Sequence, residues 1–240
     1  MKAFGGPVHL FHGDGEDGMS TASASEDMDR VRQLLSGLNE GGEGSLRIYR
    51  PQPTAAFSPR DTTLADYVRT ADAMRALGFA PVERRAGGQL AVYDQNTLVI
   101  DLVAQHSDPR NDVIERFHLF AEAIAKALRS FSIDARVGAV PGEYCPGGYS
   151  VNAGGRIKLA GLAQRIVRRG YHVGAVIGVE TSFALRAAVT EAYRSLGCDF
   201  NPESFGAIAD MVSDVTFSDL RKALIEEILL VVPAVSHSGS

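Results

Sequence analysis

Cysteine is scarce in this sequence, with Cys145 and Cys198 as the only two among 240 residues. Two cysteines imply no disulfide framework, so the chain is compatible with a reducing compartment. Long apolar runs are also missing, because runs such as Ile225 to Val235 contain acids or proline and are too short to span a membrane. The N-terminus lacks the pattern of a signal peptide, since glycine and proline break its apolar stretch. We therefore expect a cytoplasmic protein without a membrane partner.

An excess of positive charge is missing as well. The chain has 24 Lys and Arg against 29 Asp and Glu, for a formal net charge of -5. This balance argues against nucleic acid as a partner. The 45% hydrophobic content is enough to bury a substantial core over this length. We expect a single domain that spans residues 1–240.

Several standard motifs are missing too. The sequence has no GxxxxGK[ST] loop, so it fails that nucleotide fingerprint. It has no GxSxG nucleophile elbow. His9 and His12 are close together but have no third ligand nearby, and the other histidines are scattered. We therefore predict no metal site.

The elements that are present indicate an α/β (α+β) protein. The clearest helix runs from Val113 to Ser130, where apolar residues recur on one face. A stretch of Gly, Ser and acidic residues at about 13–27 predicts a flexible surface loop. Periodicity predicts further helices at 28–38, 64–77, 182–196, 202–212 and 217–232, and strands or extended segments at 46–50, 81–85, 90–103, 135–140, 162–168 and 171–179.

A hairpin is predicted from Tyr149 to Leu159. Its turn contains Asn152 and two glycines, residue types that accept the positive φ of a tight turn. The Gly/Pro-rich loop just before it, PGEYCPGGYS, carries Cys145. Free cysteine is often a small core residue, but this loop offers little for a core to pack against and would hold a thiol at a surface or cleft. Lys158, Arg84 and Arg85 are the candidate cations for a reactive thiolate.

Two further groups of residues accompany the cysteine, and each has an ordinary interpretation. Lys158 is followed by Gly161 and Gln164. It could polarise an acyl carbonyl, although most strand lysines simply face solvent. Arg84 and Arg85 precede Gly87-Gly88. This segment suits recognition of a carbonyl, carboxylate or phosphate, although a Gly-Gly pair between strands is more often only a turn.

Taken together, these segments resemble a known family. RRAGGQLAVYD (84–94) and GRIKLAGLAQR (155–165) are similar to the two signature regions of the lipoate-protein ligase A, octanoyltransferase and biotin-protein ligase superfamily. LRIYRPQPTAAFSPRD (46–61) resembles the family's early strand and loop, and the likeness covers roughly residues 46–196. It implies a mixed, largely antiparallel β-sheet flanked by helices and a tunnel for a medium-length acyl chain.

The resemblance also implies roles for individual residues. Lys158 matches the family's lysine that contacts the acyl carbonyl, and Arg84, Gly87 and Gly88 match residues that line the acyl or nucleotide pocket. Arg85, Gly161 and Gln164 lie in the same two signatures and are predicted to bind substrate. Cys145 matches the nucleophile of the cysteine-dependent octanoyl- and lipoyl-transferase branch.

Three functions follow from the resemblance. The first is transfer of an octanoyl or lipoyl group through a Cys145 thioester onto a lysine of a lipoyl carrier domain or glycine-cleavage H-type protein, with acyl carrier protein as a possible donor. This route needs no cofactor. The second is an ATP- and Mg-dependent lipoate-protein ligase that forms lipoyl-AMP. Gln89 in place of a third glycine and Asp94 directly after Tyr93 weaken that alternative. The third is a non-catalytic protein that binds an acyl group or a carrier domain.

Overall fold

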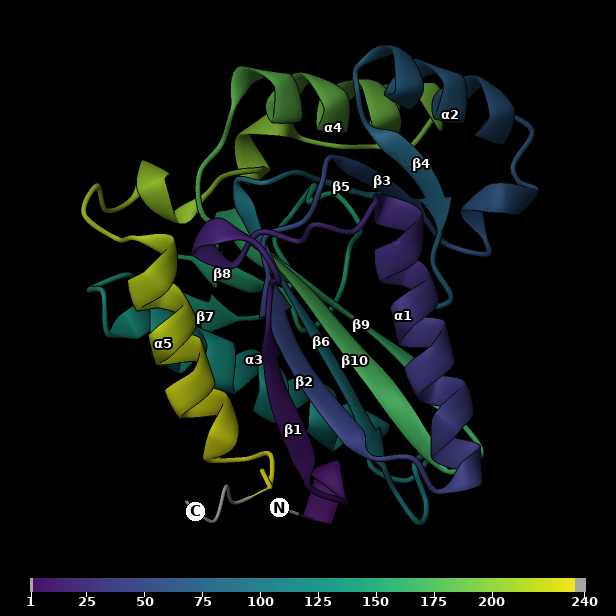
Figure 1. Ribbon diagram of the computed structural model, residues 1–240. Helices are drawn as coiled ribbons and strands as arrows, with labels where there is room; N and C mark the ends of the chain where they lie inside the picture. Colours follow the sequence, from purple (N-terminus) through teal and green to yellow (C-terminus); the bar gives the residue numbers. More distant parts are fainter. Residues whose placement is uncertain (1, 236–240) are drawn as a thin grey trace.

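The computed structural model describes residues 2–235 and contains a large and a small β-sheet with five α-helices around them (Figure 1). The large sheet has the strand order β1-β2-β6-β10-β9-β8-β7. Within the described residues, β1 and β2 pair in parallel and every other neighbouring pair in this sheet is antiparallel. The predicted mixed, largely antiparallel sheet is therefore confirmed. The strands are Val8–His12 (β1), Gly44–Tyr49 (β2), Thr97–Gln105 (β6), Ala135–Val137 (β7), Val151–Ala153 (β8), Ile157–Val167 (β9) and Gly170–Gly178 (β10).

One face of this sheet packs against helices α3 (Val113–Arg129) and α5 (Phe217–Leu229), and we call it the core face. Side chains alternate between the two faces along a strand. The core face therefore receives every second residue of the central strands, and these are apolar. Leu98, Ile100 and Leu102 of β6 join Phe120 of α3 and Leu224 of α5 in one buried cluster.

The opposite face, which we call the site face, lies under helix α1 (Ala24–Gly37) and the small sheet (Figure 1). The small sheet contains β3 (Thr54–Phe57) between β4 (Ala80–Glu83) and β5 (Ala91–Tyr93). Helices α2 (Tyr67–Ala76) and α4 (Phe183–Ser195) pack on each other and on this sheet's strands. The site face is thus covered by segments that do not belong to the large sheet.

Helix α1 begins earlier than the sequence predicted. The loop expected at about 13–27 gives way to the helix at Ala24, because Ser23 and Glu26 form a reciprocal capping box. Asp27 at the end of that predicted loop is buried and paired with Arg47. The prediction of a loop up to residue 27 was therefore wrong at its C-terminal end.

Other boundaries also differ from the predictions. The helix predicted at 202–212 is absent, and two single 3-10 turns, Pro202–Ser204 and Ile208–Asp210, stand in its place on either side of Gly206. Strand β3 lies where a loop was expected. Residues 162–168, predicted to be extended or bent, are extended through Val167 as part of β9, and the extended run 90–103 is broken by a turn at 94–97.

Candidate functional site

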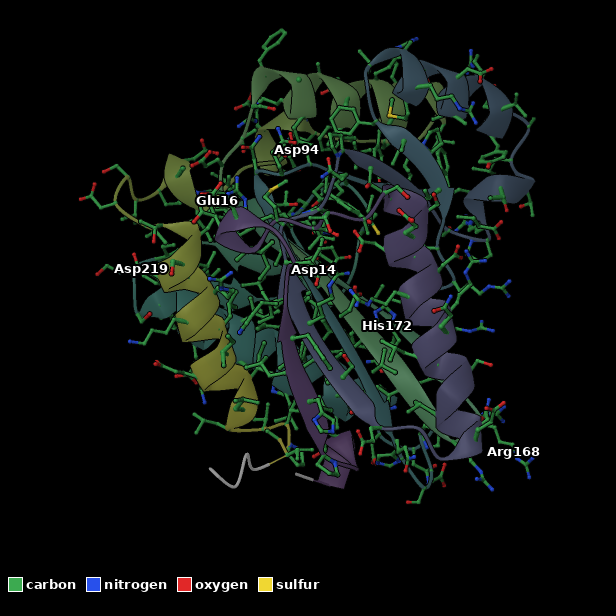
Figure 2. The ribbon with its side chains drawn as sticks, viewed as in Figure 1. Asp14, Glu16, Asp94, Arg168, His172 and Asp219 are labelled. Atoms are coloured by element: carbon green, nitrogen blue, oxygen red, sulfur yellow. The ribbon has the colours of Figure 1, made fainter. Side chains whose placement is uncertain are left out.

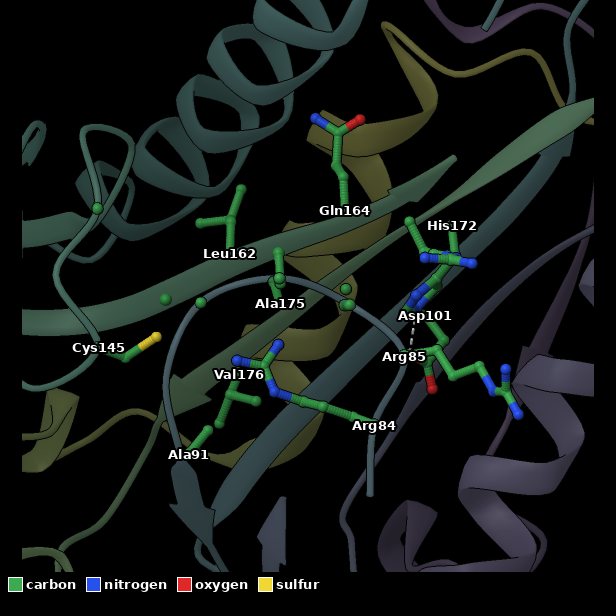
Figure 3. A pocket seen from close by; sticks show the side chains of 18 of the residues that line it. Arg84, Arg85, Ala91, Asp101, Cys145, Leu162, Gln164, His172, Ala175 and Val176 are labelled. Atoms are coloured by element: carbon green, nitrogen blue, oxygen red, sulfur yellow. Dashed lines mark hydrogen bonds and ion pairs between the residues drawn. The ribbon is translucent and has the colours of Figure 1, made fainter. Parts of the chain in front are cut away.

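A cavity of about 480 Å³ lies between the site face and the segments that cover it (Figure 3). The RRAGG loop, the cysteine loop, β9 and β10 all contribute to its wall, and Met28, Val31 and Leu35 of α1 face it as well. An open groove of about 680 Å³ shares Gly88, Pro146 and Gln164 with the cavity. The predicted site residues Arg84, Arg85, Gly87, Gly88, Cys145, Lys158, Gly161 and Gln164 all line the cavity. The fold therefore gathers both signature segments around one cavity.

Cys145 reaches the cavity from a tightly held loop. Its backbone has a φ of 43°, which is uncommon for a residue other than glycine and indicates local strain. Its N–H donates to the hydroxyl of Tyr193 at 2.6 Å, and that hydroxyl donates to the carbonyl of Leu90 at 2.8 Å. Burial raises the pKa of Tyr193 well above its ordinary value, so the hydroxyl keeps the proton that it donates. The Cys145 thiol accepts the N–H of Gln89 at 3.2 Å.

Lys158 lies beneath this loop and is 2% exposed. Its ammonium donates to the carbonyl oxygens of Tyr144 and Cys145, each at 2.9 Å. It also forms an ion pair of 3.0 Å with Oε2 of Glu143, a contact that lacks hydrogen-bond geometry. An ammonium group has three donors, and two of them are used in these hydrogen bonds while Glu143 supplies the counter-charge. Lys158 therefore holds the cysteine loop, and its predicted contact with an acyl carbonyl stays a prediction.

Glu143 completes this anchor from within the loop. Its Oε1 accepts the N–H of Val140 at 3.3 Å and of Gly147 at 3.2 Å, which ties together the two ends of the segment that carries the thiol. Its side chain is 1% exposed, as is that of Lys158. A buried carboxylate requires a compensating cation and hydrogen bonds, and Glu143 has both. Sequence reasoning missed this residue, although its position two residues before the cysteine could have drawn attention to it.

The RRAGG loop approaches the thiol closely. Gly88 has a φ of +97°, and a Cβ at this position would lie 2.9 Å from both Sγ of Cys145 and Nη2 of Arg84. Glycine is therefore required here for its backbone conformation and for space. Arg84 donates from Nη2 to the carbonyl of Gln89 at 2.7 Å, while its Nε is buried with no hydrogen-bond partner among the described residues. Arg85 is exposed at the rim.

The second signature contributes the floor of the cavity. A Cβ on Gly161 would lie 3.2 Å from Cε of Lys158, so the absence of a side chain at Gly161 leaves room for the lysine side chain. Gln164 was predicted to bind substrate. It borders the cavity, but its amide donates to the carbonyl of Val113 at 2.9 Å and accepts from Nε of Arg116 at 3.2 Å. Its polar atoms thus join β9 to α3.

A second polar cluster on the cavity wall was also missed. Neither His172 nor Asp101 was among the predicted site residues. Nε2 of His172 and Oδ1 of Asp101 are 2.7 Å apart, and His172 lies between the large sheet and α1 (Figure 2). An acid inside the apolar run TLVIDLVAQ was the available signal.

Two kinds of feature are absent from residues 2–235. No three His, Cys, Asp or Glu side chains in this range are arranged to hold a metal ion. None of the helices in the same range is both long and apolar enough to traverse a bilayer.

Comparison with known proteins places this site in a family context. The family described as the lipoyl protein ligase A/B catalytic domain matches residues 24–229. An octanoyl-GcvH:protein N-octanoyltransferase of Geobacillus kaustophilus is 29% identical over 173 residues, which are 72% of this chain and 60% of the relative. Its counterpart in Bacillus velezensis is 26% identical over 164 residues, 63% of this chain and 57% of the relative. The chain thus spans somewhat more than half the length of these relatives.

A solved structure shares the fold. The putative lipoate protein ligase Ta0514 from T. acidophilum, determined with bound lipoic acid, superposes with a TM-score of 0.68 at 20% identity. The match covers 96% of this chain and 87% of that protein.

Proposed function

Because the chain belongs to the lipoyl protein ligase A/B catalytic domain family, we propose that it transfers an octanoyl or lipoyl group through a thioester on Cys145. The acceptor is a lysine of a lipoyl carrier domain, and the donor is an acylated carrier protein. One observation carries the proposal: the thiol of Cys145 borders a cavity whose wall is largely apolar, in a loop held from below by a buried lysine. The names of the two bacterial relatives support the octanoyl group and a GcvH-type carrier.

The reaction takes place in two exchanges that balance without a cofactor. In the first, Cys145 forms a bond to the acyl carbon and the donor's C–S or C–N bond breaks, so the thiol proton leaves with the donor's thiol or amine. In the second, the acceptor lysine forms an amide with the same carbon and the Cys145 C–S bond breaks. One amine proton then returns to the sulfur. Each bond made replaces a bond broken, so ATP is not required.

Residues around the thiol stabilise charge in both exchanges. The N–H of Gln89 already donates to Sγ, so it can stabilise negative charge that develops on the sulfur during each exchange. Arg84 brings a guanidinium with an unpaired buried Nε to the same side of Gly88, which suits an oxyanion that develops beside the sulfur. Lys158 keeps the loop in position, and it can meet the acyl carbonyl by exchanging one of its two backbone partners.

The test is incubation of the protein with an octanoylated carrier and an apo lipoyl domain, with and without ATP, followed by intact-mass measurement. We expect one octanoyl group on the wild-type protein and on Cys198→Ala, and none on Cys145→Ala, which should also fail to modify the acceptor. ATP should make no difference. The matched control is Cys198, since burial raises the pKa of its thiol above the ordinary value and keeps it largely protonated.

Three results would overturn the proposal. Octanoyl transfer by Cys145→Ala would rule out the thioester mechanism. Lipoate-dependent release of pyrophosphate from ATP would favour the ligase. Binding of donor or acceptor without turnover would indicate a non-catalytic protein.

A further inference from the structure

The proposed chemistry leaves one buried polar cluster of the cavity without a role. The side chains of Asp101 on β6 and His172 on β10 are 8% and 11% exposed, and both line the cavity. Oδ1 of Asp101 contacts Nε2 of His172 at 2.7 Å, and Oδ2 accepts from the hydroxyl of Tyr49 at 3.1 Å. Nδ1 of His172 has no partner among the described residues. A buried polar pair in an apolar wall is costly unless it is well compensated.

The strand register places this pair away from the thiol. Gly161, beside Lys158, lies opposite Val176 on β10, whereas His172 lies opposite Arg165, four residues further along. Four residues of antiparallel strand span about 13 Å. Figure 3 likewise shows Cys145 and the Asp101–His172 pair on opposite sides of the cavity. His172 is thus too distant to act as a base at Cys145 and instead stands at the far end of the acyl path.

The dimensions fit an acyl chain of eight carbons. With carbon–carbon bonds of about 1.5 Å at near-tetrahedral angles, an extended octanoyl chain is roughly 9 Å long. A chain that starts at the register of Gly161 and Val176 and runs along the site face would therefore end between Gly174 and His172. Gly174 points to the same face as His172, and a Cβ on it would lie 3.0 Å from Cε1 of the imidazole.

The end of this path is held in place by a chain of buried contacts. The guanidinium of Arg47 stacks on the ring of Tyr49 at 3.8 Å and pairs with Asp27 of α1 at 2.5 Å. The imidazole is therefore bound by Asp101, Asp101 by Tyr49, and Tyr49 by a residue anchored to the covering helix. A side chain with this support cannot move aside without breaking buried hydrogen bonds.

We propose that His172, held by Asp101, is the specificity-determining residue that ends the acyl site and limits the transferred group to about eight carbons. This inference rests on the proposed function, because it takes the cavity to hold the acyl chain. It assigns His172 no chemical step. A longer chain has to displace the imidazole from Asp101, and a smaller residue at position 172 would lengthen the site.

The first experiment measures charging of the protein by hexanoyl, octanoyl, decanoyl and dodecanoyl thioesters of a carrier, read by intact mass. We expect the wild-type rate to peak at octanoyl. In His172→Ala, each methylene that now enters the apolar space should gain about fourfold, so decanoyl should improve relative to octanoyl by about fifteenfold. The control His118→Ala changes an exposed histidine on α3 and should keep the wild-type ratios.

A second variant tests the same wall in the opposite direction. Gly174→Ala adds a methyl group directly before the imidazole, so the optimum should move from octanoyl towards hexanoyl. This variant keeps both side chains of the Asp101–His172 pair, with the imidazole shifted by a few tenths of an ångström, so it also tests the proposal if His172→Ala fails to fold. Unchanged chain-length ratios in the folded variants would overturn the proposal.

A binding measurement separates this inference from the proposed function. Calorimetry with the four free fatty acids is carried out on Cys145→Ala, alone and combined with His172→Ala. If no thioester ever forms but binding shows the same shift in chain length, the thioester mechanism fails and the role of His172 stands. If charging occurs on Cys145 with ratios that His172→Ala leaves unchanged, the mechanism stands and the inference fails.

Discussion

Along β6 and β10, consecutive residues differ in polarity, because one points to the core face and the next to the site face. Ile100 and Val173 point to the core face and are fully buried among apolar side chains of α3 and α5. Asp101 and His172, each next to one of them in sequence, point to the site face and meet each other across the strands. The core face thus buries apolar surface, while the site face buries polar groups that require one another.

Stability and specificity arise on different faces of the large sheet. Burial of apolar area stabilises the protein with little dependence on exact partners. Buried polar pairs contribute little net stability, yet they lose much when one partner is removed. The core face should therefore tolerate changes that leave the reaction intact. The site face should show the reverse, and three changes test this contrast.

The largest effect is expected from breaking the Glu143–Lys158 pair. Glu143→Leu leaves a buried ammonium without its counter-ion and should lower the free energy of unfolding by about 3–5 kcal/mol. The double variant Glu143→Leu/Lys158→Met should recover much of this loss, because two apolar side chains can replace a buried ion pair. Neither protein should transfer octanoyl groups, since the cysteine loop has lost its anchor.

Urea denaturation and the transfer assay measure these two outcomes. Asp134→Ala removes a fully exposed ion pair with Arg136 and serves as the control that should change little. If the double variant were as unstable as Glu143→Leu, the unpaired ammonium of Lys158 would not be the cause of the lost stability. If the double variant transferred octanoyl groups, the anchor would not be needed.

A somewhat smaller loss is expected on the core face. Ile100→Ala removes a fully buried side chain and should lower the free energy of unfolding by about 2–5 kcal/mol, depending on how far the cavity collapses. The ratios of charging by different acyl chains should remain those of the wild type, because the side chain faces away from the site. The neighbouring change Asp101→Asn should alter those ratios instead. A shifted chain-length optimum in Ile100→Ala would show that the two faces are coupled.

Much of the fold could be predicted because local pattern determines it. Spacing of apolar residues predicted a helix at 113–130, and α3 occupies Val113–Arg129. The turn residues Gly154 and Gly155 both adopt positive φ between β8 and β9, as the hairpin prediction required. The family resemblance drawn from the two signature segments was confirmed by the match over residues 24–229.

Other elements escaped prediction because tertiary context determines them. Strand β3 lies directly after Pro53, and its pairing partners β4 and β5 come more than twenty residues later in the chain. The helix expected at 202–212 fails, since Pro202 and Gly206 limit it to single turns. The local sequence pattern carries no information about the distant segments whose pairing and packing determine the structure of such regions.

The candidate site divides in the same way. Cys145 and the residues of the two signatures could be named because each lies in a short segment that resembles a motif of the family. The Asp101–His172 contact joins positions 71 residues apart, and only the register between β6 and β10 brings them together. The role of Lys158 as an anchor likewise required the folded position of Glu143, because a strand lysine alone predicts a side chain that faces solvent.

The last substitutions affect two adjacent glycines in the loop that covers the site face. They should have the smallest effect on stability, and one of them should have a large effect on activity. Gly88→Ala has to adopt a φ of +97°, which should cost about 1 kcal/mol of unfolding free energy. Its methyl group would also press on the thiol of Cys145, and such a displacement can slow charging by about a hundredfold. Gly87→Ala meets no atom within 4 Å, so it should leave stability unchanged and slow charging less than Gly88→Ala does. Equal charging rates in the two variants would mean that the thiol is not confined by this loop, and the close contact at Gly88 would then be only structural.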